Sequence, residues 1–209
     1  MVINVDNIIQ TIENEKQKVN ICYDQNGDSP REWDNIGKMV LKHRDYDMPC
    51  ECDINLNECD TIEELTKQLK KEYKALVVLP VYMYDHSGIS LSTGTQYPFN
   101  CRWDSSTIGV IFTNEESLKA LGVKTRSKKK LIEYLKGEVE TYSQYLSGDV
   151  YGFELIEVSK CDKCNEVHEE FIDSCYGYYG SDFKENGLIE AIQELTEDLN
   201  KELKEEFGK

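Results

Sequence analysis

The sequence predicts an α+β protein, a single domain in which a mainly antiparallel sheet is flanked by helices and followed by an amphipathic, acidic C-terminal helix. Short apolar runs rich in β-branched and aromatic residues alternate with segments of helical periodicity. The 209 residues suffice for one sizeable core. The sequence contains no internal repeat and no Pro/Gly/Ser-rich linker. We therefore expect a core domain over residues 1–180 and a C-terminal helix over residues 181–209, packed on the core or on a partner.

The expected strands follow from alternation and from short apolar runs. Val19, Ile21 and Tyr23 alternate with polar residues, which favours a hairpin over residues 8–24, and a helix over residues 6–15 is the alternative. The run from Leu76 to Tyr82 has the composition of a buried strand. Further strands are expected at residues 107–113, 150–158 and 171–179.

The expected helices are marked by their first residues. Residues 29–32 (Ser-Pro-Arg-Glu) form a capping box, as do residues 61–64 (Thr-Ile-Glu-Glu). The first box predicts a helix that carries Trp33, Ile36, Met39, Val40 and His43. Helices are also expected from residue 114 and over residues 127–146. At the C terminus, apolar residues recur in helical register at Leu188, Ile192, Leu195, Leu199 and Leu203.

The net charge of −16 restricts the classes of partner. An excess of acidic residues repels DNA, RNA and anionic lipid surfaces, so direct nucleic-acid binding is disfavoured. Two interpretations stay open. The acidic surface either serves solubility alone, or it engages a basic partner, for example by imitating DNA.

The N-terminal residues and the cysteines indicate the cellular compartment of the protein. Residues 1–6 lack the basic and apolar regions of a signal peptide, and no apolar run has the length of a membrane span. Eight cysteines without a secretion signal indicate a reducing cytoplasm, where thiols stay free or bind metal. We therefore expect a cytoplasmic protein that makes no use of a membrane.

The first candidate site is a polar group around the strand at residues 76–82. Asp85, His86 and Ser87 follow this strand, and Cys101 and Asp104 precede the next strand. In a nucleophilic interpretation, His86 takes the proton of Cys101 and Asp104 orients the imidazole. In a metal interpretation, His86 binds a divalent ion together with Asp85 and Asp104. In a structural interpretation, His86 and Ser87 make a hydrogen-bonded turn, and Cys101 and Trp103 fill the core.

The second candidate is a cysteine-rich segment near the end of the sheet. Cys161 and Cys164 have the C-x-x-C spacing that chelates zinc from a tight turn, and His168 and Cys175 would complete a tetrahedron. Zinc is therefore the one cofactor that the sequence suggests. Free thiols on a hairpin turn and a redox dithiol are the alternatives.

A third group of carboxylates is less indicative. Glu138 and Glu140 are two residues apart on a predicted helix and point to different sides, which is typical of surface acids. Asp149 is more informative because it lies where that helix gives way to a strand. It is therefore retained as a catalytic candidate together with Asp85, His86, Cys101 and Asp104.

Several blocks together resemble a family of small proteins encoded by bacteriophages and related mobile elements. The blocks are residues 29–37 (SPREWDNIG), 84–89 (YDHSGI), 101–105 (CRWDS), 137–142 (GEVETY), 148–153 (GDVYGF) and 173–180 (DSCYGYYG). The resemblance covers most of residues 19–180 and implies a phage setting, but no particular reaction. The blocks are rich in residues of exposed type, which we expect to converge in one ligand-binding pocket. Its predicted residues are Arg31, Asp34, Asp85, His86, Ser87, Asp104 and Asp173.

These observations predict a phage-encoded cytoplasmic accessory protein that acts by binding. The expected role is inhibition of a nucleic-acid-directed host defence or early takeover of the host, with the acidic surface engaging a basic host protein or nucleic-acid enzyme. The alternative is a small metal-dependent hydrolase or nucleotide-binding protein that uses Asp85, His86 and Asp104. The oligomeric state does not follow from the sequence.

Overall fold

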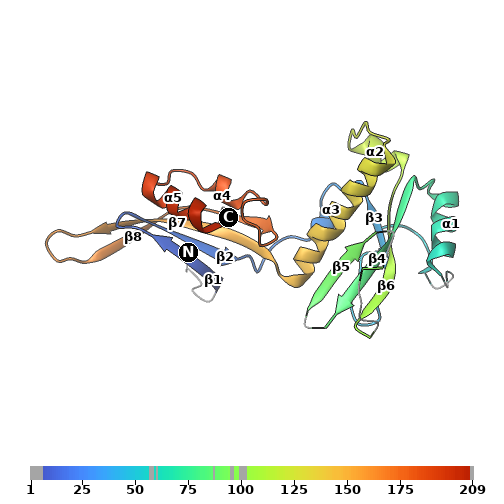
Figure 1. Ribbon diagram of the computed structural model, residues 1–209, viewed down its shortest axis with the longest axis horizontal. Helices are drawn as coiled ribbons and strands as arrows, with labels where there is room; N and C mark the ends of the chain where they lie inside the picture. The colour runs from blue at the N-terminus through green and yellow to red at the C-terminus, as the bar shows by residue number, and fades with distance from the viewer. Residues whose placement is uncertain are drawn as a thin grey trace. The chain divides into compact units, whose positions relative to one another are not determined.

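Two antiparallel sheets, each with its own helices, organise the chain in a computed structural model (Figure 1). The structure describes residues 7–56, 59, 61–86, 88–94, 97–98 and 103–207. The chain divides into two compact units: unit 1 holds the described residues up to 28 and from 148 onward, and unit 2 holds residues 29–147. The predicted α+β class, the antiparallel pairing and the acidic C-terminal helix are confirmed. The division into units was not predicted, and it does not coincide with the expected boundary at residue 180.

Unit 1 contains a four-stranded sheet in the order β1-β2-β7-β8. The strands are β1 (Ile8–Glu13), β2 (Gln17–Tyr23), β7 (Val150–Lys160) and β8 (Val167–Tyr179). The β1–β2 hairpin confirms the prediction for residues 8–24. Its turn is fixed by Asn14, whose side-chain oxygen accepts hydrogen bonds from the backbone of Lys16 at 2.9 Å and Gln17 at 2.8 Å. Unit 2 occupies the stretch of chain between β2 and β7, which are neighbours in this sheet.

One face of this sheet is covered by two helices, α4 (Leu188–Ala191) and α5 (Glu197–Phe207). Val19, Ile21, Phe153 and Leu155 of the sheet pack against Leu188, Leu199 and Leu203 of the helices. The sequence predicts one continuous helix here, which is wrong. The helix is interrupted where Glu194 has φ 63°, and the Gln17 side chain bonds the backbone on both sides of that turn. The predicted leucines are buried nonetheless, so the C-terminal helix packs within its own chain.

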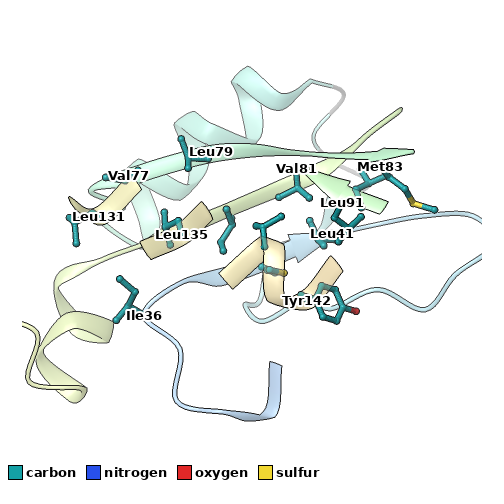
Figure 2. Close-up of a cluster of buried hydrophobic side chains, with 14 of the residues drawn as sticks. Ile36, Leu41, Val77, Leu79, Val81, Met83, Leu91, Leu131, Leu135 and Tyr142 are labelled. Atoms are coloured by element: carbon teal, nitrogen blue, oxygen red, sulfur yellow. The ribbon is translucent and has the colours of Figure 1, made fainter. Parts of the chain in front are cut away.

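Unit 2 contains the second sheet, in the order β3-β6-β4-β5. The strands are β3 (Lys38–Leu41), β4 (Val77–Asp85), β5 (Ile89–Thr93) and β6 (Ser105–Thr113). The long helix α3 (Lys128–Ser147) covers one face. Figure 2 shows Leu131, Leu135 and Tyr142 of α3 together with Val77, Leu79, Val81 and Met83 of β4. The predicted buried stripe of this helix is confirmed.

The opposite face of the second sheet is covered by α1 (Ile62–Glu72). Leu65 and Leu69 of this helix pack with Val40, Val110 and Phe112 of the sheet. Thr61 caps α1 as predicted, since its side chain accepts a hydrogen bond from Glu64 N at 3.2 Å. The short helix α2 (Glu115–Ala120) is capped by Asn114. Both faces of this sheet are therefore buried, unlike those of the first.

The sequence predicts a helix from residue 29 to residue 43, and the structure shows that this prediction is wrong. The capping box forms only a single 3-10 turn, η2 (Pro30–Glu32), and β3 follows. Met39, Val40 and Leu41 are paired with Ile111, Val110 and Gly109 of β6. Burial of alternate residues against α1 and α3 outweighs the local helix signal, because it removes both sets of apolar side chains from water.

Candidate functional site

The polar group at the open ends of β4 and β6 is partly assembled as predicted. The backbone N–H of Asp85 donates to the carbonyl of Asp104 at 2.8 Å, which sets the two chain segments side by side. His86 Nδ1 lies 3.4 Å from Asp104 Oδ2. The hydroxyl of Tyr46 donates to Asp85 Oδ2 at 2.9 Å, and this bond raises the pKa of Tyr46. The imidazole of His86 and the carboxylate of Asp104 therefore meet on unit 2, and the backbone of Asp85 lies beside Asp104.

Asp85 and Asp104 line a hollow of about 600 Å³ at the surface of unit 2. Its rim carries Lys42 and Arg44 as well as Asp85 and Asp104. Trp103, also on the rim, is 96% exposed, which is unusual for a large aromatic side chain. The His86 side chain is 65% exposed. Because water reaches the pair freely, this geometry suits the binding of a polar ligand better than catalysis in a dry site.

Two predicted members of this site, Ser87 and Cys101, lie outside the described residues. The nucleophilic pairing of Cys101 with His86 therefore stays a prediction. The structure adds two members that the sequence did not indicate. Tyr46 contacts Asp85, and His43 stacks on the Tyr46 ring at 5.0 Å between centroids. Both come from the loop at residues 44–60 or just before it, which has no periodic pattern that predicts where its side chains point.

Arg31 belongs to a buried ion-pair network in a different part of unit 2. Its side chain is 7% exposed and makes a two-point contact with Glu51, with both N–O distances at 2.8 Å. It also pairs with Glu138 at 3.1 Å and donates to the Gly37 carbonyl at 2.7 Å. All of its donor groups face protein, so Arg31 holds η2 to β3 and α3 and does not bind a ligand as predicted.

Glu138 was expected to be a surface acid, and the structure shows that this is wrong. Its carboxylate accepts hydrogen bonds from the backbone N–H groups of Ile36 and Gly37 at 3.0 Å. Burial raises the pKa of Glu138, and the Gly37 N–H and Arg31 partly offset that effect. A side chain at position 37 would come within 2.5 Å of this carboxylate, so the close approach requires glycine there.

The predicted pocket residues Asp34 and Asp173 and the catalytic candidate Asp149 come from other segments of the chain. Asp34 is exposed in the segment between η2 and β3. Asp149 and Asp173 belong to unit 1, where Asp149 accepts a hydrogen bond from Tyr151 at 3.2 Å and Asp173 bonds the backbone of Ser174. Among the described residues of unit 2, the predicted set is therefore divided: Asp85, His86 and Asp104 lie together, whereas Arg31 lies in the buried ion-pair network.

The C-x-x-C segment forms the turn that joins β7 to β8. Cys161 N donates to the Glu166 carbonyl at 2.8 Å, and Asn165 N donates to the Cys161 carbonyl at 2.9 Å. The backbone N–H groups of Cys164 and Lys163 donate to the Cys161 sulfur and lower its pKa. Both thiols are free and accessible at the tip of the hairpin.

The other two predicted zinc ligands do not complete a site at this turn. Cys175 pairs with Phe153, eight residues along β7 from Cys161, which is a separation of about 26 Å at the rise of a strand. His168 pairs with Ser159 on the exposed part of the hairpin. Among the described residues, no group of three or more His, Cys, Asp or Glu side chains is placed to hold one metal ion. The predicted set is therefore not assembled within one chain.

Strand β8 is a surface feature that the sequence did not reveal. It is 13 residues long, and nearly every side chain along it is exposed. Among the described strands none pairs with its outer edge. Glu169, Glu170 and Asp173 make it acidic, and Phe171 and Ile172 are 46% and 40% exposed. The density of acids over residues 166–173 is the one sequence signal that would have indicated it.

No match was found when the chain was compared with models of protein families, with curated proteins and with solved structures. The resemblance to phage-encoded proteins therefore stays a prediction. In the part of the chain that the structure describes, no helix combines the length and apolar character that crossing a membrane requires.

Proposed function

We propose that this protein is a phage-encoded accessory protein of the host cytoplasm that acts by binding a basic site on a host protein. The expected target is an enzyme of a nucleic-acid-directed defence, or another nucleic-acid enzyme taken over early in infection. The setting follows from the resemblance of the sequence blocks, and the basic target follows from the net charge of −16. Strand β8 is the single observation that carries the proposal.

The outer edge of β8 offers main-chain hydrogen-bonding groups to an incoming strand. Residues 167–171 pair with residues 156–160 of β7 without a break, so this stretch is regular enough to extend the sheet. It contains Glu169 and Glu170 but no lysine or arginine. The occupant that fits is therefore an extended basic segment of the partner, whose lysine or arginine side chains pair with these carboxylates.

Apolar contact would add to this charge attraction. Val167, Phe171 and Ile172 are all at least 40% exposed, and burying such side chains is favourable by about 25 cal/mol for each Å² removed from water. Lys18 already pairs with Glu169, so a partner would compete with that contact. We expect binding that weakens strongly with added salt.

The test uses two peptides of alternating residues, one with lysine and valine and one with glutamate and valine. We expect the full chain to bind only the basic peptide in calorimetric titrations at low ionic strength. The double variant Glu169→Lys/Glu170→Lys is expected to lose at least about tenfold in affinity. The matched control Glu202→Lys/Glu205→Lys changes the net charge equally on exposed positions of α5 and should retain most of the affinity. Equal loss in both variants would show attraction to bulk charge and would contradict a site at β8.

A second measurement tests whether the partner is a host nucleic-acid enzyme. Proteins captured from a bacterial host lysate by the wild-type chain, but not by the β8 variant, should include a nucleic-acid enzyme. That enzyme should lose nuclease or helicase activity when the chain is added and recover it at high salt. An enzyme that binds but stays fully active would argue against inhibition.

A second candidate function is supported by the His86 group. The 3.4 Å approach of His86 to Asp104 favours a nucleotide-binding protein over a metal-dependent hydrolase, because Asp85, His86 and Asp104 are not placed to hold one metal ion. His86→Ala and Asp104→Asn should then abolish nucleotide binding or hydrolysis and leave the melting temperature unchanged, because His86 is largely exposed. Nucleotide binding that is unaffected by either change would exclude this site.

A further inference from the structure

The C-x-x-C turn of unit 1 projects beyond the core of its own unit. The last buried residues of β7 are Leu155 and Ile156, and Glu157, Ser159 and Lys160 beyond them are exposed. At the rise of a strand, five residues from Ile156 place Cys161 about 16 Å farther along the hairpin. Figure 1 shows the β7–β8 hairpin extending past the helices of its unit.

The C-x-x-C segment closes a tight turn in which its two thiols are neighbours. The Cys161 carbonyl accepts from Asn165 N, and Asn165 has φ 59°, so the chain folds back between these two residues, and the Cys164 side chain forms a hydrogen bond with Cys161. Two backbone N–H groups, from Lys163 and Cys164, point at the Cys161 sulfur. Such donors offset part of the negative charge that builds up when thiolates bind a cation.

A single turn is nevertheless only half of a zinc site. Structural zinc is almost always bound by four ligands, and the turn supplies two. Glu166 Oε2 lies 3.8 Å from the Cys164 sulfur, but among the described residues no group of three His, Cys, Asp or Glu side chains is placed to hold one metal ion. An exposed tip that cannot complete the site from its own unit is well placed to meet an identical tip.

The charge near the β7–β8 turn favours contact between the turns of two copies. The chain as a whole carries −16, so two copies repel each other. The tip is different, because Lys160 and Lys163 balance Asp162 and Glu166. Four thiolates around one Zn²⁺ leave a charge of −2, which the lysines of two tips would also help to neutralise. Contact at the tips alone keeps the acidic bodies of the two copies apart.

We propose that the β7–β8 turn is one half of a structural zinc site, and that the same turn of a second copy of this chain supplies the other two thiolates. The site joins two copies through Cys161 and Cys164 of each. This proposal stands apart from the proposed function, since it uses neither β8 beyond the turn nor the His86 group.

The experiment measures metal content by elemental mass spectrometry and molar mass by light scattering on the full untagged chain, purified with zinc and with reductant. We expect one zinc ion for every two chains and a molar mass twice that of the 24.2 kDa chain. Chelation should remove the metal and return the protein to a monomer. Substitution by cobalt(II) should give the intense thiolate absorption of a four-sulfur site.

Cysteine variants test whether the metal and the dimer both depend on the β7–β8 turn. Cys161→Ser/Cys164→Ser should lose both the metal and the dimer, whereas Cys175→Ser, about 26 Å away along the strand, should keep both. Because the tip is exposed, circular dichroism of the double variant should match that of the wild type. One zinc ion in a monomer, or zinc retained by the double variant, would overturn the proposal. So would a metal-free protein, or a dimer that resists chelation and dissociates only with reductant.

Discussion

The two sheets of this chain differ in how many of their faces are covered. In unit 2, α1 and α3 lie on opposite faces, and the central strands β4 and β6 are buried along most of their length. In unit 1, α4 and α5 cover one face, and most side chains of β8 are exposed, with Tyr178 near its end packed on the core. The number of sheet faces covered by helices therefore decides which strands are buried. Unit 2 is a buried scaffold that carries a polar hollow, whereas unit 1 presents the outer edge of β8.

The two units also differ in how their buried carboxylates are stabilised. In unit 2, Glu51 and Glu138 share the guanidinium of Arg31. In unit 1, Glu154 is 8% exposed and accepts a hydrogen bond from the Tyr176 hydroxyl at 2.9 Å. Its other oxygen is buried and has no hydrogen-bond partner among the described residues. An acid inside unit 2 thus belongs to a charge network, whereas the one inside unit 1 depends on a single neutral donor.

The largest expected effect comes from breaking the network of unit 2. Arg31→Ala leaves two carboxylates without their cation, and removal of one partner from a buried pair costs about 3–5 kcal/mol. Burial by itself lowers the pKa of Arg31, but Glu51 and Glu138 raise it above its ordinary value, so the guanidinium stays charged. Denaturant titration should show this loss in the free energy of unfolding. Arg126→Ala, which removes an exposed pair with Glu115, is the control and should leave it unchanged.

The second test asks whether the two cores unfold separately. Leu135→Ala in unit 2 and Leu199→Ala in unit 1 each empty a fully buried site and should cost about 2–5 kcal/mol. Hydrogen exchange followed by mass spectrometry should show faster exchange only in the unit that carries the substitution. Uniform acceleration across both units in either variant would mean that the chain unfolds as one cooperative body.

Two glycines on central strands, one in each unit, should differ in how much stability is lost when they are replaced by alanine. Gly109 of β6 has φ 148°, and a Cβ there would collide with the Val40 carbonyl and lie 2.9 Å from Leu41 Cα. A Cβ on Gly152 of β7 would meet the ring of Tyr176 and lie 2.8 Å from the Cys175 carbonyl oxygen, and the φ of Gly152 is not in the left-handed region. Gly109→Ala should cost about 1–3 kcal/mol because the contact with the Val40 carbonyl oxygen is far shorter than van der Waals distance and the φ of 148° is strained for alanine, and Gly152→Ala should cost less because its backbone contact is longer and its φ is not strained. Denaturant titration giving the reverse order would contradict this account.

The smallest expected effect is a dependence on alkaline pH. Burial, together with the charge of Glu154, raises the pKa of Cys22 from 9.0 to about 11. Between these pH values the unfolded chain loses the thiol proton while the folded chain keeps it, so the free energy of unfolding falls as pH rises. Cys22→Ala should make this decline shallower in denaturant titrations between pH 9 and 11. Some decline should persist, because burial also raises the pKa of Cys52 in unit 2 to about 11. An unchanged slope would mean that Cys22 is not protected by the fold.

The sequence by itself determined the local elements whose signal is strong. The capping residues Thr61 and Asn114 begin α1 and α2, and the apolar stripe of α3 faces its sheet, because caps and periodicity act over a few residues. The C-x-x-C turn was likewise recognisable from spacing alone. The proximity of Asp85 and Asp104, in contrast, follows from the antiparallel pairing of β4 with β6, which the sequence did not predict.

Only the tertiary structure decided the features that depend on distant partners. Residues 38–41 became a strand because β6 pairs with them, although a helix start precedes them. Glu138 became a buried acid because Arg31, 107 positions away in the chain, reaches it. The exposure of β8 depends on helices that cover only the other strands of its sheet. Such outcomes are set by burial and pairing between segments far apart in the chain, and local sequence patterns carry no record of them.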